Sequence, residues 1–286
     1  MNIRDNFLSS NNYTFKQIDQ NWHNDPLFKL LEVFIDANLN KILIENQIFL
    51  GLTNEPLIFL NDLNLKETKI NPDFLIFASR HTSKAARPAF LTHVTGNWSG
   101  EAEFGGEPNE LCIASALLLK AGYITLLKNS KKQSLLDFSI DMEVTHHGPT
   151  NLNKPLIFME LGSTKKEWSI KEAGKFVANS IINTIKTYLD LKKESNQIIG
   201  LGFGGTHYAP NFQRLIKENN IALSFICPKY YIQDLNKEMI SKMINNTMEK
   251  INFFIIDWKS VNAEDKQHLI PILEEFDIPI KKTKDF

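Results

Sequence analysis

The chain has 286 residues, of which 43% are hydrophobic and 23% charged, a composition typical of a globular protein with a sizeable core. No run of about 18 apolar residues occurs, and the N-terminus lacks the apolar stretch of a signal peptide, so we expect no membrane span. The net charge of −1 argues against nucleic-acid binding over the whole surface but permits a local basic patch. The two cysteines, Cys112 and Cys227, lie in apolar runs outside any CxxC pair, which favours a cytoplasmic protein over a disulfide framework.

Strands and helices alternate along the chain, which predicts an α/β fold. Residues 1–70 hold short apolar runs, a candidate N-terminal subdomain within what we expect to be one domain over residues 1–286. Buried strands are predicted at 75–78 and 90–95. Helical spacing over 107–121 then predicts a helix that stops at Gly122.

The second half continues the same alternation. Residues 137–145 alternate as a strand, which places Glu143, Thr145 and His147 on one face and His146 on the other. A buried strand follows at 155–161, and a capping box at 169–172 predicts a long helix to about Leu191. Further strands are predicted at 197–203, 222–226 and 252–257. Polar motifs follow the strands, at the edge where open α/β sheets bind ligands.

The first two motifs carry one histidine each. Residues 78–84 read ASRHTSK and combine two cations, an imidazole and hydroxyls, which suits a metal or phosphate site as well as a solvated loop. Residues 92–98 read THVTGNW. A histidine within a strand is more often a buried core residue than a ligand, so we favour a structural role for His93.

The most specific motif is EVTHHGPT, at residues 143–150. Two adjacent histidines in extended backbone cannot easily chelate one ion, but the turn at Gly148-Pro149 could swing one of them inward. Otherwise one is a ligand or base and the other orients a neighbour. Glu160 lies in the apolar motif FMELGST, where an unpaired carboxylate is costly, so we expect it to pair with a histidine, a metal or an arginine.

The fifth motif is GFGGTHYAP, at residues 202–210. Its glycines allow close backbone approach, and Pro210 suits the first turn of a helix. Such a turn offers N–H groups to an oxyanion or phosphate. No GxSxG, P-loop, GxGxxG or HExxH pattern occurs, which argues against serine hydrolases, P-loop enzymes and classical dinucleotide enzymes.

Together these five collinear motifs, between about residues 75 and 230, resemble those of the archaeal and plant D-aminoacyl-tRNA deacylases. The resemblance implies hydrolysis of D-aminoacyl-tRNA to a free D-amino acid and tRNA. It implies a compact α/β core similar to peptidyl-tRNA hydrolase and phosphorylase-type proteins, with zinc as the cofactor. Two departures stand out: Asn211 replaces a basic residue, and Ser224-Phe225 replaces a Gly-His pair, which leaves the number of metal ions open.

The resemblance and the residue chemistry together nominate a site. The metal candidates are His81, His146, His147, Glu160 and His207, and the catalytic candidates are His147, His81 and Glu143. A metal-free variant would use a histidine as general base and the Gly204 and Gly205 amides as oxyanion donors. The sequence leaves both variants open.

Substrate contacts are expected at two places. A local patch of Arg80, Lys84 and Arg87 would hold the tRNA acceptor end, with Lys128, Lys131 and Lys132 as a weaker second cluster. Gly204 and Gly205 would border the aminoacyl pocket together with Thr206, and Tyr208 would either cap the terminal adenine or pack in the core. We expect the protein to act as a monomer.

Two other functions compete with this hypothesis. One is a metal-dependent peptidase or nucleosidase on a related α/β core, which would cleave free peptides or nucleosides and leave aminoacyl-tRNA intact. The other is a non-catalytic module that binds tRNA or a metal. The second alternative explains the Gly-rich turn but not the many histidines at strand ends.

Overall fold

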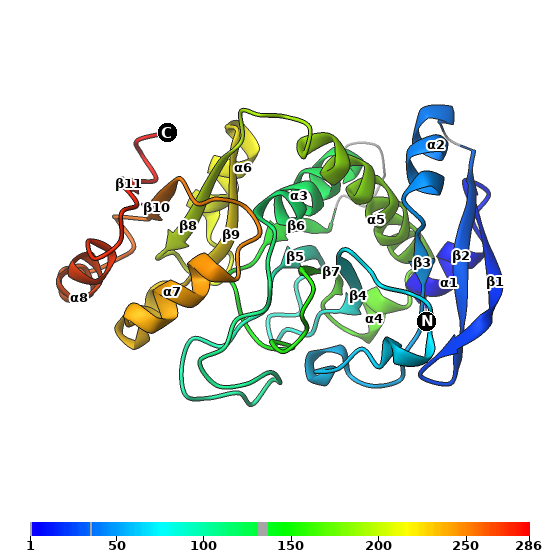
Figure 1. The fold of residues 1–286 in the computed structure, drawn as a ribbon, viewed down its shortest axis with the longest axis horizontal. Coiled ribbons are helices and arrows are strands. Elements are labelled where there is room, and N and C mark those ends of the chain that lie inside the picture. Colours follow the sequence, from blue (N-terminus) through cyan, green and yellow to red (C-terminus); the bar gives the residue numbers. More distant parts are fainter. Residues whose placement is uncertain (1, 35, 131–136) are drawn as a thin grey trace.

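The computed structural model describes residues 2–34, 36–130 and 137–286, which form three β-sheets and their covering helices. The fold is mixed α/β, as the alternation of strands and helices predicts. Figure 1 shows the central sheet between an N-terminal sheet and a C-terminal sheet. No helix in the described ranges is long and apolar enough to cross a lipid bilayer.

The N-terminal sheet is antiparallel, with the strand order β1-β2-β3. It comprises β1 (Tyr13–Trp22), β2 (Asp25–Val33) and β3 (Phe49–Leu50), with helices α1 (Asn2–Leu8) and α2 (Ala37–Glu45) beside it. Two short 3-10 turns, η1 (Leu57–Phe59) and η2 (Leu65–Glu67), lead to the central sheet. Helix α1 packs against the long helix α5 (Lys171–Leu191), which joins this sheet to the rest of the core.

The central sheet is mixed, with the order β4-β7-β5-β6. Its strands are β4 (Leu75–Arg80), β5 (Ala89–His93), β6 (Ser139–Met142) and β7 (Leu156–Gly162), and β5 runs antiparallel to β7 while the other two pairings are parallel. Helices α3 (Ala116–Ser130) and α5 cover one face, above the sheet in Figure 1, and the short α4 (Lys165–Trp168) precedes α5. The opposite face is therefore free to carry polar side chains.

The C-terminal sheet is parallel throughout, with the order β11-β10-β8-β9. It comprises β8 (Ile198–Phe203), β9 (Ile221–Cys227), β10 (Phe253–Ile256) and β11 (Ile280–Lys282). Its connections are α6 (Pro210–Glu218), η3 (Lys229–Asp234), α7 (Lys237–Asn245) and α8 (Ala263–Leu273). All three late strands predicted from the sequence are present in this sheet.

Two helix predictions are wrong for identifiable reasons. Residues 107–121 do not form one helix, because Leu111 and Ile113 make isolated bridges to Gly96 and Pro155, and α3 begins only at Ala116. Gly122 does not end this helix. A side chain there would lie 3.1 Å from both Ile157 and Thr92, so the glycine lets α3 lie close against the sheet.

The predicted capping box at 169–172 also does not form. The N-cap of α5 is Ile170, which makes no side-chain capping bond. The capping box lies one turn earlier, where Thr164 and Glu167 cap α4. The far end of α5, at Leu191, agrees with the prediction because the apolar spacing of that helix is long and regular.

The segment after β6 joins the central sheet to the C-terminal sheet. The Glu143 amide donates to the Thr92 carbonyl at 3.1 Å, which continues the pairing with β5. The next two amides donate across to the other sheet, from Val144 to the His207 carbonyl at 2.9 Å and from Thr145 to Ile226 at 3.1 Å. The most histidine-rich part of the chain is therefore held between two sheets.

Candidate functional site

Glu160 lies on the face of the central sheet opposite to α3 and α5 and is almost fully buried. The strand register pairs Ser79 and Leu91 with Glu160, so side chains of three neighbouring strands share this face. The Ser79 hydroxyl donates to one Glu160 oxygen, and His81 Nδ1 lies 3.2 Å from the other. Glu160 therefore pairs with a histidine, one of the three partners that the sequence predicts.

His93 ends β5 two residues beyond Leu91, on the same face, and is fully buried. Its Nδ1 is 3.1 Å from the Val94 carbonyl, and its Nε2 is 3.8 Å from Glu160 Oε2 with no hydrogen-bond partner in the described chain. The ring stacks on Phe158, with centroids 5.2 Å apart. The stacking on Phe158 and the complete burial fit the structural role that we favour for His93, while the unpartnered Nε2 leaves a ligand role open.

His146 and His147 both point into this cluster, with ring centroids 4.5 Å apart. The expected alternation of faces fails here, because β6 ends at Met142 and His147 adopts a left-handed backbone with φ of 46°. This region is uncommon for non-glycine residues, although histidine adopts it more readily than most, and here it accompanies the approach of the two rings. Each ring donates its Nδ1–H to a main-chain carbonyl, Val144 at 2.8 Å and Gly148 at 2.6 Å, so Nε2 remains as the free nitrogen.

Glu143 and His207 form the bridge between the two sheets. His207 follows β8, and its Nε2 lies 2.8 Å from Glu143 Oε1. The Glu143 side chain is fully buried, whereas 38% of the His207 side chain is exposed. The second Glu143 oxygen has no hydrogen-bond partner within the described ranges. The pair thus presents an imidazole to solvent with a buried carboxylate behind it.

These seven side chains make three overlapping groups whose ligand-type atoms lie within 4.8 Å of one another. Five of the seven histidines of the chain take part, together with two carboxylates. The three groups are His93, His146 and His147; Glu143, His146 and His207; and His81, Glu143 and Glu160. The structure therefore brings together every predicted catalytic or metal-ligating residue and adds His93.

The histidines of the cluster fall into two groups, one with a lowered pKa and one with a raised pKa. Burial, reinforced by the neighbouring histidines, lowers the pKa of His147 to about 4 and holds that of His146 well below its usual range. For His81 and His93, burial acts in the same direction, but the Glu160 and Glu143 carboxylates outweigh it and raise the pKa. Burial would raise the pKa of Glu160, yet the two histidines hold it well below its usual value.

The Gly-rich turn after β8 differs from what we expected. The Gly204 amide donates to the Cys227 carbonyl at 2.8 Å and the Gly205 amide to Ser260 Oγ at 2.6 Å, so neither is free for an oxyanion. Both glycines are buried and have positive φ, and a side chain on Gly204 would meet Ser260 at 2.6 Å. They allow the tight turn that positions His207, and the prediction of free oxyanion donors is wrong.

The basic residues predicted to bind tRNA have different neighbours in the structure. The Arg87 guanidinium bonds Asp141 at 2.6 Å and lies 4.7 Å from the Tyr208 ring centroid, next to His207. Arg80 instead lies over Trp168, and Lys84 is exposed beyond the end of β4. Of the second cluster, Lys128 is exposed near the end of α3, whereas Lys131 and Lys132 lie outside the described residues.

Both departures from the family pattern have structural partners of their own. The Asn211 side chain donates to both Asp257 oxygens at 3.0 Å, at the start of α6. Ser224 is buried in β9 and bonds Thr247 at 2.8 Å, while Phe225 lies in the core. Neither position belongs to the histidine–carboxylate cluster.

The chain matches known proteins over most of its length. Residues 68–281 match the family model described as D-aminoacyl-tRNA deacylase. A D-aminoacyl-tRNA deacylase of Thermococcus onnurineus is 34% identical over 278 residues, covering 96% of this chain and 92% of the relative. That of Pyrococcus furiosus is 36% identical, covering 84% of this chain and 87% of the relative.

A solved structure has the same fold. It is the crystal structure of a conserved protein of unknown function, with a TM-score of 0.80 and 30% sequence identity, covering 99% of this chain and 91% of the other. The comparisons do not favour the peptidase or nucleosidase alternative. The motifs, the cluster that they build and these matches lead to one conclusion: the chain belongs to the D-aminoacyl-tRNA deacylase family.

Proposed function

We propose that this protein hydrolyses the ester bond of D-aminoacyl-tRNA at the cluster of five histidines and two carboxylates. The observation that carries the proposal is the convergence of these seven side chains from two sheets, in a chain of this family. An aminoacyl ester is an activated substrate. The site must supply a base for water, positive charge for the carbonyl oxygen and a surface that rejects the L-form.

Zinc is the proposed cofactor, and the donor set fits it. His93, His146 and His147 each direct Nδ1 to a main-chain carbonyl, the arrangement that leaves Nε2 for a metal and fixes the ring. The low pKa values of His146 and His147 keep these rings neutral near pH 7, as ligands must be. The Nε2 of His93 also has no hydrogen-bond partner in the described chain. Because Glu160 and Glu143 raise the pKa of this ring, His93 would have to release a proton to hold zinc. Zinc held there would act as a Lewis acid that polarises the ester carbonyl.

The Glu143–His207 pair is the proposed base. If His207 donates Nε2–H to the buried carboxylate, its Nδ1 becomes the acceptor for a proton from water. The Glu143 carboxylate then stabilises the imidazolium that forms, since their atoms are only 2.8 Å apart. His207 is the most exposed imidazole among those paired with a carboxylate at this site, which suits contact with substrate.

His81 supplies positive charge to the proposed reaction. Burial lowers the pKa of His81, but the Glu160 and Glu143 carboxylates outweigh it and shift the ring towards its protonated form, and Glu160 holds that ring through Nδ1. A cationic ring would stabilise the charge that develops on the carbonyl oxygen. Gly162 makes room for this ring, because a side chain there would lie 2.9 Å from the His81 imidazole.

The direct test is turnover of D-tyrosyl-tRNA and L-tyrosyl-tRNA by the purified protein, with a His207→Asn variant prepared in parallel. We expect release of D-tyrosine, little release of L-tyrosine, and a loss of about 10²-fold or more in the variant. Metal analysis of the same preparations tests zinc separately. Equal turnover by wild type and variant would assign the activity to a contaminant or to another site.

A further inference from the structure

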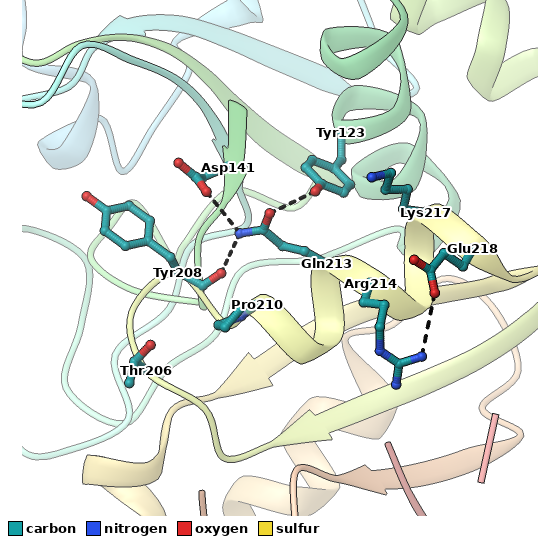
Figure 2. A pocket seen from close by; sticks show the side chains of 9 residues that line it. All are labelled: Tyr123, Asp141, Thr206, Tyr208, Pro210, Gln213, Arg214, Lys217 and Glu218. Atoms are coloured by element: carbon teal, nitrogen blue, oxygen red, sulfur yellow. Dashed lines mark hydrogen bonds and ion pairs between the residues drawn. The ribbon is translucent and has the colours of Figure 1, made fainter. Parts of the chain in front are cut away.

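A pocket opens beside the chain segment that carries His207, between α3 and α6, with a volume of about 460 Å³. Both chain neighbours of His207, Thr206 and Tyr208, line it (Figure 2). Its size is within the range of small-ligand sites, which is about 300–1,000 Å³. His207 itself does not line the pocket, so a group bound here would lie next to the segment that positions the proposed base.

The floor of the pocket is a fixed hydrogen-bond network. Tyr123 on α3 donates its hydroxyl to Gln213 Oε1 at 2.7 Å, and Gln213 Nε2 donates to the Tyr208 carbonyl at 2.5 Å. The same Nε2 lies 3.3 Å from Asp141, as the dashed lines of Figure 2 show. Gln213 is buried, so this network holds the main chain of Tyr208 in place against both helices.

One rim of the pocket is an aromatic ring with a guanidinium stacked over it. Arg87 lies 4.7 Å from the centroid of the Tyr208 ring and is anchored by Asp141 at 2.6 Å. The same ring lies T-shaped against the His207 ring, with centroids 5.3 Å apart. Aromatic rings and arginine planes are the surfaces on which proteins stack unpaired bases of RNA.

The other rim carries cations from α6. Arg214 lies 3.7 Å from Glu218 and donates to the Thr283 carbonyl, so it is partly engaged. Lys217 has no hydrogen bond or ion pair with any residue in the described parts of the chain, and it lines the pocket across from Tyr208 in Figure 2. Lysine side chains without a partner in the protein commonly contact the phosphate groups of nucleic acids.

We propose that this pocket binds the 3′-terminal nucleotide of the tRNA, with its base against Tyr208 and Arg87 and its 5′-phosphate at Lys217. The proposal rests on the proposed function, because it assumes that the ester lies at the histidine cluster. In a nucleotide, the base, the 5′-phosphate and the 2′- and 3′-hydroxyl groups project from the ribose in three different directions. From Pro210 to Lys217 the helix advances about 10 Å, and we place the two hydroxyl groups at Thr206 and Tyr208, the chain neighbours of His207 that line the pocket.

The probe is AMP, which has the base, sugar and 5′-phosphate of the tRNA 3′ terminus. We expect AMP to bind wild type in a calorimetric titration and to inhibit D-tyrosyl-tRNA hydrolysis competitively. Tyr208→Ala should weaken both adenosine and AMP by at least about 10-fold, the scale of one stacked base. Lys217→Gln should weaken AMP by a similar factor while adenosine binds as before.

The matched control is Lys175→Gln, a change of the same kind on an exposed position of α5 outside the pocket. It should leave AMP binding unchanged. Lys217 is itself exposed, so its substitution tests the proposal even if Tyr208→Ala does not fold.

The outcomes separate the two proposals. If wild type cleaves D-tyrosyl-tRNA but AMP does not bind, or binds all three variants equally, the pocket is not the nucleotide subsite and the proposed function stands. If AMP binds with the expected dependence on Tyr208 and Lys217 while no D-tyrosyl-tRNA is cleaved, the pocket is a nucleotide site and the proposed function is wrong.

Discussion

Replacing Glu143 with glutamine removes one buried negative charge while keeping the size of the side chain. Its carboxylate lies 2.8 Å from His207 Nε2 and is fully buried, so no water replaces it as a partner for the imidazolium. Loss of a residue that supports a general base typically lowers the rate about 10²–10⁴-fold. That range corresponds to about 2.7–5.4 kcal/mol of transition-state stabilisation. We expect kcat/KM on D-tyrosyl-tRNA to decrease by a factor within this range of about 10²–10⁴.

Stability should respond differently from activity. The second oxygen of Glu143 has no hydrogen-bond partner in the described chain, so removing its charge relieves a desolvation penalty in metal-free protein, but it also removes the attraction to His207, His81 and His93. Because these effects oppose each other, we expect the thermal midpoint of metal-free Glu143→Gln to stay close to that of wild type.

The assay is initial-rate deacylation with metal content measured on the same samples, and Glu172→Gln on the exposed start of α5 is the charge-matched control. The measured metal content shows whether a lower rate comes from the loss of the general base or from the loss of a bound metal ion. A Glu143→Gln protein that retains both its metal and more than about a tenth of the wild-type rate would refute the role of this carboxylate.

Three further predictions concern other residues. His93→Asn should lower the zinc stoichiometry of purified protein, which metal analysis would show; unchanged zinc would exclude His93 as a ligand. Gly162→Ala should displace His81, since the new Cβ lies 2.9 Å from its ring, and slow deacylation of a folded protein; a wild-type rate contradicts this. Burial lowers the pKa of Lys120 to about 8, so the unfolded chain holds more protons between pH 8 and about 10.5. Denaturant unfolding should therefore show wild type gaining stability relative to Lys120→Met as pH rises through that window, and a constant difference would contradict the shift.

The positions along the chain of the strands after residue 75, and most members of the histidine–carboxylate cluster, could be predicted from the sequence. Strongly apolar strands such as β7 and β8 lie within about two residues of their predicted bounds. Their continuous runs of apolar residues indicate buried strands directly. Glu160 was identified as a paired carboxylate from its apolar surroundings alone, and its pairing with His81 follows that logic.

The errors arose where tertiary contacts decide the outcome. Strand alternation cannot anticipate the left-handed backbone at His147, which turns two consecutive rings into one cluster. The direction of β5 against β7, which brings His93 beside Glu160, depends on connections far apart in the chain. The Gly-rich turn predicts free amides at Gly204 and Gly205, but both amides donate hydrogen bonds to other segments of the chain.

The central claim is that this cluster cleaves the D-aminoacyl ester of tRNA. The most direct measurement is single-turnover deacylation of paired D- and L-tyrosyl-tRNA by wild type and by His207→Asn, with enzyme in excess. We predict rapid cleavage of the D-ester, slow cleavage of the L-ester, and loss of the D-ester rate in the variant. Equal cleavage of both esters by wild type, or an unchanged D-ester rate in a folded His207→Asn protein, would contradict the claim.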